Sequence, residues 1–386
     1  MMATQTRVPS QRTAWARAPW EISSAWTSGW AGYLRSAARR GAGPATVLND
    51  TAVWFRAVTR RRTPGWSTEH TVVRNWPQAR LLDFSTGTSA VPTLVLPPQA
   101  GHASSIVDYS PEQSQIRTAL EAGLDSLYCL DWLPATAETA GSTIEDYVGI
   151  LDDAVGRLGG RVNLIGDCQG GWLASIYAAL RPGAVHSLSV GGAPIDFHAG
   201  RSAIREWMKA TGAGDPMRPY RAMVALGRGR YRGRNQLLAF KMLEPAGEAE
   251  RVMDLWAHID DPAHVERFND FTDWFEWTQD IAGPFYLWIV EHLFVRNELV
   301  AGTLTVGGER VDLGRITAPL LILAGTRDHI TPAAQAWALD TYAATSPEQA
   351  RRESVDAGHL GLFMGHTALR EHWLPGLRAV AALPRP

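Results

Sequence analysis

The sequence contains very little cysteine. Only two cysteines, Cys129 and Cys168, occur among its 386 residues. That number excludes a disulfide-stabilised scaffold, and two thiolates cannot build the four-cysteine sites that hold structural zinc. A catalytic thiol is compatible with so low a number, so the local sequence around each cysteine has to decide its role.

The sequence also lacks the common cofactor motifs. The pairs Gly191-Gly192 and Gly307-Gly308 do not belong to a G-x-G-x-x-G pattern, and no P-loop or zinc-ligand spacing occurs. We therefore expect no metal and no resident cofactor. The formal net charge of −2 gives no overall basic field, so we expect no nucleic-acid partner. No stretch reaches about 18 consecutive apolar residues, so we expect no transmembrane segment.

Charge is unevenly distributed along the chain. Residues 1–64 hold ten arginines and two acidic residues, a charge of +8, which leaves −10 for the remainder. We interpret residues 1–75 as a basic, tryptophan-rich N-terminal extension that forms helices and packs on the main domain. The alternatives are a transit peptide and a surface that docks on an apolar or anionic interface.

Short apolar runs alternate with helical patterns from about residue 78, which predicts a mostly parallel sheet flanked by helices. Ser142 to Glu145 reads as a capping box at the start of one helix. The predicted strands are Ala79–Phe84, Thr93–Pro97, Ser126–Leu130, Val162–Ile165, Ser187–Val190 and Pro319–Ala324, and the clearest helical stretches are Glu112–Ala122 and Ser142–Leu158.

The alternation is interrupted by an aromatic-rich helical stretch. We expect residues 76–196 and 311–386 to form the α/β core and residues 197–310 to form a large helical cap. Ligands bind at the carboxyl ends of strands in open α/β sheets, so we expect the cap to lie over that edge.

The segment from Gly166 to Gly170 is typical of a nucleophile elbow, in which a strand turns sharply into a helix. Cys168 stands at the centre, and Gly166 and Gly170 avoid clashes with neighbouring elements. The N–H of Gln169 at the helix start is one predicted oxyanion-hole donor. A buried, inert thiol is the alternative for Cys168, and it is the interpretation that we prefer for Cys129 within a predicted strand.

A thiol nucleophile needs a base and a residue that orients it. Asp328 follows a predicted strand, and His359 lies in the later sequence Gly-His-Leu-Gly. This order of nucleophile, acid and histidine is that of the α/β-hydrolase fold. His329 and Asp356 are nearby alternatives, and Asp196 is a rival third member.

The second oxyanion-hole donor should come from the loop after the strand Thr93–Pro97. Pro97 and Pro98 have no N–H, so Gln99 or Ala100 is expected to donate.

These motifs together resemble those of the polyhydroxyalkanoate synthases, especially the shorter two-component kind. The similar stretches, over about residues 90–378, are Gly166–Gly171, Ile106–Tyr109, Leu130–Trp132, Asn297–Gly302, Gly307–Leu313, Asp328–Pro332 and Gly358–Gly361. The resemblance implies that Cys168 carries the growing chain as a thioester and that His359 takes the thiol proton. It implies that Asp328 orients His359 or helps to activate the incoming 3-hydroxyl. The substrate would be 3-hydroxyacyl coenzyme A, with coenzyme A carried by the substrate.

The loop from Pro97 to Ala103 is instead similar to that of the intracellular polyhydroxyalkanoate depolymerases, which also use cysteine. Hydrolysis of a polyester or thioester is therefore the alternative function, and a non-catalytic granule-binding protein is a third. The family resemblance implies a partner subunit or homodimer and a polymer-granule surface as partners. A working thiolate favours a reducing, cytoplasmic setting, with granule association as a further expectation.

Overall fold

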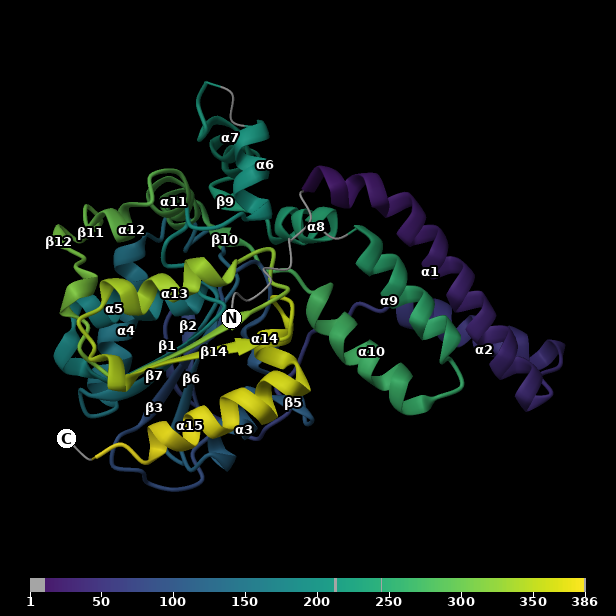
Figure 1. Ribbon diagram of the computed structural model, residues 1–386, viewed down its shortest axis with the longest axis horizontal. Helices are drawn as coiled ribbons and strands as arrows, with labels where there is room; N and C mark the ends of the chain where they lie inside the picture. Colours follow the sequence, from purple (N-terminus) through teal and green to yellow (C-terminus); the bar gives the residue numbers. More distant parts are fainter. Residues whose placement is uncertain (1–10, 212–213, 244, 385–386) are drawn as a thin grey trace, which may run out of the picture. The chain divides into compact units, whose positions relative to one another are not determined.

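The computed structural model describes residues 11–211, 214–243 and 245–384, so the first ten residues of the expected extension lie outside the described residues. The described chain forms two compact units. One comprises Trp66–Gly233 and Gln279–Pro386 and holds the large sheet. The other joins the residues up to Gly65 with Arg234–Thr278 (Figure 1).

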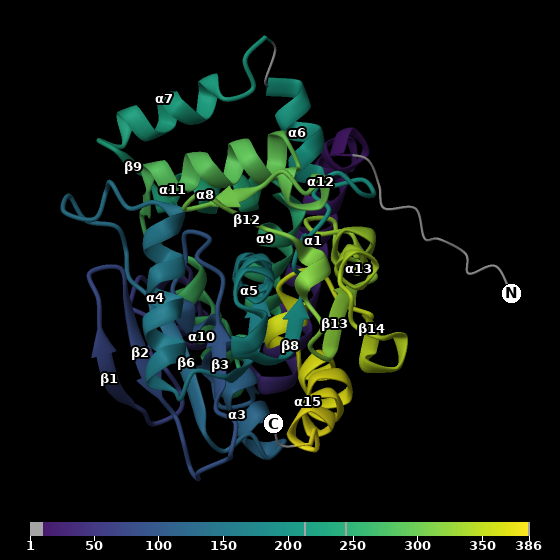
Figure 2. The ribbon, with the colours of Figure 1, turned by 90° about the vertical axis from the view of Figure 1, so that its left-hand side faces the viewer.

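The large sheet has eight strands, and its first and last strands lie at opposite edges (Figure 2). β1 pairs antiparallel with β2, and β2 pairs antiparallel with β6, whereas the remaining neighbours are parallel. This is the strand order of the α/β-hydrolase fold, so the predicted fold class is confirmed. Across the sheet the strands are β1 (Thr71–Asn75), β2 (Ala79–Asp83), β6 (Leu127–Trp132), β3 (Thr93–Leu96), β7 (Val162–Asp167), β8 (Val185–Gly191), β13 (Leu320–Gly325) and β14 (Ala350–Val355).

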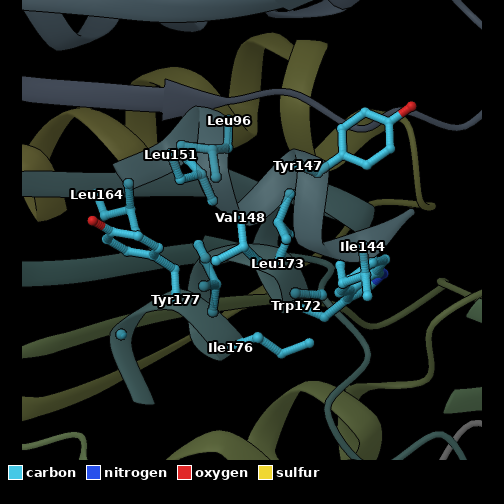
Figure 3. Packing of buried hydrophobic residues seen from close by; sticks show 14 of the residues in the cluster. Leu96, Ile144, Tyr147, Val148, Leu151, Leu164, Trp172, Leu173, Ile176 and Tyr177 are labelled. Carbon is cyan, nitrogen blue, oxygen red and sulfur yellow. The ribbon is translucent and has the colours of Figure 1, made fainter. Parts of the chain in front are cut away.

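Helices cover both faces of this sheet. On one face α3 (Gln115–Glu121) contacts α15 (Leu374–Ala381), and on the other lie α4 (Ile144–Arg157), α5 (Gln169–Leu180) and α13 (Ala333–Tyr342) (Figure 2). Figure 3 shows how α4 and α5 pack over β3 and β7 through large side chains such as Tyr147, Leu151, Trp172 and Tyr177. Each of these four side chains is almost completely buried, and burial of this kind stabilises by about 1.5–3 kcal/mol per large apolar side chain.

The capping box at the start of α4 lies one residue later than predicted. Thr143 is the N-cap, and its N–H donates to Asp146 Oδ2 at 2.7 Å. Ser142 is buried, and its hydroxyl accepts a hydrogen bond from Gln78 Nε2 at 3.0 Å, outside the helix. Glu145 accepts a hydrogen bond from the N–H of Gly307 at 3.1 Å instead.

Residues 197–310 do not stay together as one unit. The parts before Arg234 and after Thr278 belong to the unit of the sheet, and the middle part belongs to the other unit. The former parts comprise α6 (Ala203–Thr211), α7 (Arg218–Leu226), the two-stranded pair β9 (Arg230–Tyr231) and β10 (Ile281–Ala282), α11 (Gly283–Trp288), a π-helical segment (Ile289–Val295), α12 (Glu298–Ala301), and the hairpin β11 (Thr305–Val306) and β12 (Glu309–Arg310).

The second unit is helical. Gly29 and Gly32 of α1 face α9, and a Cβ on either would lie 2.7 Å from Met253 or Ala257, so these glycines permit close helix packing. Tyr33 stacks on Trp256 with ring centroids 4.1 Å apart. The unit contains α1 (Gln11–Arg40), α2 (Pro44–Val58), α8 (Gly233–Leu243, from Arg234 onward), α9 (Pro245–Ala257) and α10 (Pro262–Phe275).

Acidic side chains of the same unit compensate part of the basic charge near the N-terminus. Arg60 binds Asp273 through Nε and Nη2, with a shortest distance of 2.7 Å, and Arg61 lies 3.2 Å from Glu276. The residues of the expected 1–75 extension that follow Gly65, including β1, belong to the sheet unit instead. Within the described residues, no helix carries an apolar run long enough to cross a bilayer.

Candidate active site

Cys168 occupies the turn between β7 and α5. Its backbone has φ 48° and ψ −112°, a positive-φ conformation that a non-glycine residue rarely adopts. Its N–H donates to the carbonyl of Gly191 at 2.8 Å, which fixes the turn to the neighbouring strand β8. The thiol side chain is partly accessible, whereas Asp167 directly before it is completely buried.

Glycines make this turn sterically possible. A Cβ on Gly166 would lie 2.6 Å from the carbonyl oxygen of Gly170, and a Cβ on Gly170 would overlap the carbonyl oxygen of Leu96. The structure adds Gly171, where a Cβ would collide with Ala193. The requirement for glycine at positions 166 and 170, predicted from the motif, therefore has a direct steric cause.

His359 and Asp328 are brought together by neighbouring strands. Asp328 follows β13, and His359 follows β14, and these parallel strands end at the same edge of the sheet. His359 Nδ1 lies 2.6 Å from Asp328 Oδ2. Asp328 Oδ1 accepts hydrogen bonds from the N–H groups of Ile330 (2.9 Å) and Thr331 (2.8 Å). Both carboxylate oxygens of Asp328 are thus engaged, and one is directed at the imidazole.

The imidazole of His359 is linked to Cys168 as well. Burial by itself lowers the pKa of His359, but the charges of Asp328 and Cys168 and hydrogen bonds to both raise it well above the ordinary histidine value. Since Nδ1 faces Asp328, Nε2 is left for the sulfur. Phe363 packs edge-on against the ring with centroids 5.2 Å apart. The site therefore favours an imidazolium held between a carboxylate and a sulfur.

The expected oxyanion-hole residues lie at the start of α5 and after β3. Gln169 is the first residue of α5, so its N–H has no acceptor within the helix. Gly170 approaches the carbonyl oxygens of Leu96 and Pro97, which brings the start of the loop containing Gln99 to the elbow. Gln99 is buried, and its Nε2 donates to Tyr147 Oη at 3.2 Å. Which of Gln99 and Ala100 donates its backbone N–H stays a prediction.

The alternative residues have other roles. Cys129 is fully buried in β6, and burial raises the pKa of its thiol well above the ordinary value, with Asp131 contributing. Asp356 is 80% exposed and pairs with Arg327.

Asp196 binds the backbone around it, and His329 takes part in a backbone contact. Asp196 Oδ1 accepts hydrogen bonds from the N–H groups of His198 and Ala199 and from the side chain of Asn297 (2.8 Å), so it fixes a loop. The carbonyl of His329 accepts the N–H of Ala203 at 3.1 Å.

Asp167 lies directly beside Cys168, although no motif of the sequence gives it a role. Burial raises the pKa of its carboxyl to about 8, while Gln115 Nε2, which lies 3.2 Å from Oδ1, and the charge of His359 act in the opposite direction. Asp167 is therefore largely protonated at neutral pH. A carboxyl group inside an apolar strand was the signal that could have drawn attention to it.

The strand order and this group of side chains together define an enzyme of the α/β-hydrolase fold. Residues 69–377 match the family described as protein of unknown function, DUF3141, and the chain belongs to that family.

Several curated proteins share just under 30% identity with this chain. Poly(3-hydroxyalkanoate) polymerase subunit PhaC of Haloferax mediterranei is 27% identical over 74% of this chain and 58% of its own length. Its namesake from Allochromatium vinosum is 28% identical over 69% of this chain and 74% of its own length. A Rhizobium meliloti protein, described as an uncharacterized protein in the ackA 5′ region, is 29% identical over 73% of this chain. This chain matches only 40% of that protein's length.

Among solved structures, the chain is similar to 2-hydroxy-6-oxo-6-phenylhexa-2,4-dienoate hydrolase from Rhodococcus sp. strain RHA1. The two are 16% identical, with a TM-score of 0.42, over 81% of this chain and all of the hydrolase.

Proposed function

We propose that this protein transfers 3-hydroxyacyl groups from coenzyme A to a growing polyester through a thioester on Cys168. The observation that carries the proposal is the linked arrangement of Asp328, His359 and Cys168, in which His359 bears a raised pKa. The similarity to PhaC polymerase subunits supports the choice of substrate.

In the first step the sulfur of Cys168 attacks the thioester carbonyl of the substrate. The N–H of Gln169 and a second N–H from the loop at Gln99 stabilise the negative charge on the carbonyl oxygen. The thiol proton, held by His359, passes to the sulfur of the departing coenzyme A. One thioester replaces another, so the acyl group enters the enzyme at little cost in free energy.

In the second step the 3-hydroxyl of another substrate attacks the acyl-cysteine. His359 accepts the hydroxyl proton, and the chain moves onto that substrate as an ester, leaving the Cys168 thiolate free. Both oxygens of Asp328 already hold partners, which favours its role in orienting His359 over direct activation of the hydroxyl.

Hydrolysis through the same acyl-cysteine is the second candidate, because water could replace the 3-hydroxyl in the second step. A purely binding protein would need none of the three linked side chains, so their presence counts against that function.

The test supplies the purified full chain with 3-hydroxybutyryl coenzyme A. We expect coenzyme A release together with insoluble polymer. Release with free 3-hydroxybutyrate as the only product would contradict polymerisation and support hydrolysis. The Cys168→Ala variant is the negative control for both reactions, and Cys129→Ala is the matched positive control.

A further inference from the structure

Three potential metal ligands meet where α9 ends and α10 begins. Asp254 lies in the last turn of α9, His258 directly follows that helix, and His264 lies in the first turn of α10. One ligand atom from each residue lies within 4.8 Å of the others. All three belong to the helical unit that contains α1 and α2, and none takes part in the Cys168 site.

The distances within this group suit a small cation. Asp254 Oδ1 lies 3.2 Å from His258 Nδ1, and Asp254 Oδ2 lies 3.2 Å from His264 Nε2. The two imidazole rings lie beside each other, with centroids 4.8 Å apart. Tetrahedral zinc with bonds of about 2.0–2.1 Å holds its ligand atoms about 3.3 Å from one another. The two carboxylate–imidazole distances of 3.2 Å are close to this value. His258 Nδ1 also lies 3.0 Å from the backbone carbonyl oxygen of Asp254, and an ion at the site would replace that contact.

An ordinary surface network of hydrogen bonds is the alternative. Asp254 and His258 are more than half exposed, so their pairing contributes little to stability. His264 is less exposed than Asp254, and its Nε2 faces the carboxylate of Asp254 at 3.2 Å.

We propose that Asp254, His258 and His264 bind one divalent transition-metal ion of the zinc class, with water completing its coordination. Two imidazoles and one carboxylate are a donor set that suits such an ion. The spacing Asp-x3-His-x5-His crosses a helix end and matches no common motif, so the sequence predicted no metal at these residues. The ion would tie the end of α9, the helix that packs against α1, to the start of α10.

Binding can be measured by isothermal titration calorimetry of the full chain, purified without a polyhistidine tag, with zinc chloride. The Cys168→Ala background removes the accessible thiol as a competing zinc ligand. We expect one ion per chain. Asp254→Asn and His264→Ala should each weaken binding by about tenfold or more, since even indirect partners of metal ligands contribute this much. His366→Ala, which changes an exposed histidine elsewhere, should leave the affinity unchanged.

A second variant and a spectroscopic probe keep the test decisive. His258 is 55% exposed, so His258→Ala should fold normally while still weakening zinc binding. Co²⁺ bound at the site should give visible absorption bands that zinc displaces and that are lost in His258→Ala. Absence of saturable zinc binding to the Cys168→Ala parent, or zinc affinities of the His258→Ala and His264→Ala variants equal to that of the parent, would overturn the proposal.

Discussion

His359 Nδ1 lies 2.6 Å from Asp328 Oδ2 although 31 residues separate them in the sequence. The contact is possible because β13 and β14 are parallel neighbours whose carboxyl ends meet at one edge. The backbone N–H groups of Ile330 and Thr331 hold the other oxygen of Asp328. These hydrogen bonds fix the carboxylate, and the carboxylate orients the imidazole.

Replacing Asp328 with asparagine should strongly reduce acyl transfer. The amide can present its N–H to His359 Nδ1 and favour the wrong tautomer, and an equivalent change in a serine-histidine-aspartate site lowers kcat by about 10⁴. We expect a loss of about 10³–10⁴ in the rate of coenzyme A release. Asp356→Asn is the matched control, since Asp356 is exposed and pairs with Arg327. Equal rates in the two variants would show that Asp328 does not orient the base.

The two cysteines should differ completely in covalent labelling. Cys168 is partly accessible at the elbow, whereas Cys129 is buried and its pKa is raised by burial. Mass spectrometry after brief exposure to 3-hydroxybutyryl coenzyme A should find the acyl group on Cys168 alone. Cys129→Ala should retain the label, and Cys168→Ala should lose it. A labelled Cys168→Ala protein would refute the assigned nucleophile.

Asp167→Asn should change how stability depends on pH. The folded-state pKa of Asp167 is raised to about 8 from an ordinary value near 3.8, so the folded state binds the proton more tightly. The proton on Asp167 therefore stabilises the folded wild type at low pH, and this stabilisation is lost as pH rises from about 4 to about 8. Asparagine has no such proton to lose. We expect the free energy of unfolding of the variant to rise by up to a few kcal/mol relative to that of the wild type over this pH interval.

Urea unfolding at pH 5, 6.5 and 8 would measure that difference for Asp167→Asn. Asp356→Asn changes an exposed position, so its free energy of unfolding should differ from that of the wild type by about 0.5 kcal/mol or less at all three pH values. A pH-independent difference for Asp167→Asn would mean that Asp167 is ionised in the folded protein.

Alanine should be tolerated at Gly149 but not at Gly170. A Cβ on Gly170 would overlap the carbonyl oxygen of Leu96, so we expect Gly170→Ala to lose about 1–3 kcal/mol of stability and to disturb the elbow. Gly149 lies within α4 with open space around its Cβ position, so Gly149→Ala should gain about 0.5–1 kcal/mol. Thermal unfolding of both variants checks this, and similar melting temperatures would contradict the steric argument.

Much of the fold follows from local pattern. All six predicted strands are present with small shifts at their ends. Five of them are buried strands with parallel neighbours, which are typically continuous apolar runs, and β2 is antiparallel to both of its neighbours. The predicted N-cap of α4 was wrong by one residue. The hydroxyl of Ser142 accepts a hydrogen bond from Gln78, which lies 64 residues away in the sequence and meets Ser142 only in the folded chain. Residues 197–310 were expected as one cap, yet Arg234–Thr278 groups with the N-terminal helices through contacts such as that of Gly29 with Met253.

The sequence by itself determined the elbow, since Gly166, Cys168 and Gly170 express a local steric requirement. The sequence favoured Asp328 as the acid but left Asp196 and Asp356 as alternatives, and only the tertiary structure decided that Asp328 faces His359. It also decided that Asp167 is buried and that arginines near the N-terminus pair with distant acids. Local sequence determines the path of the backbone, whereas long-range packing determines which side chains are buried and which ones come into contact.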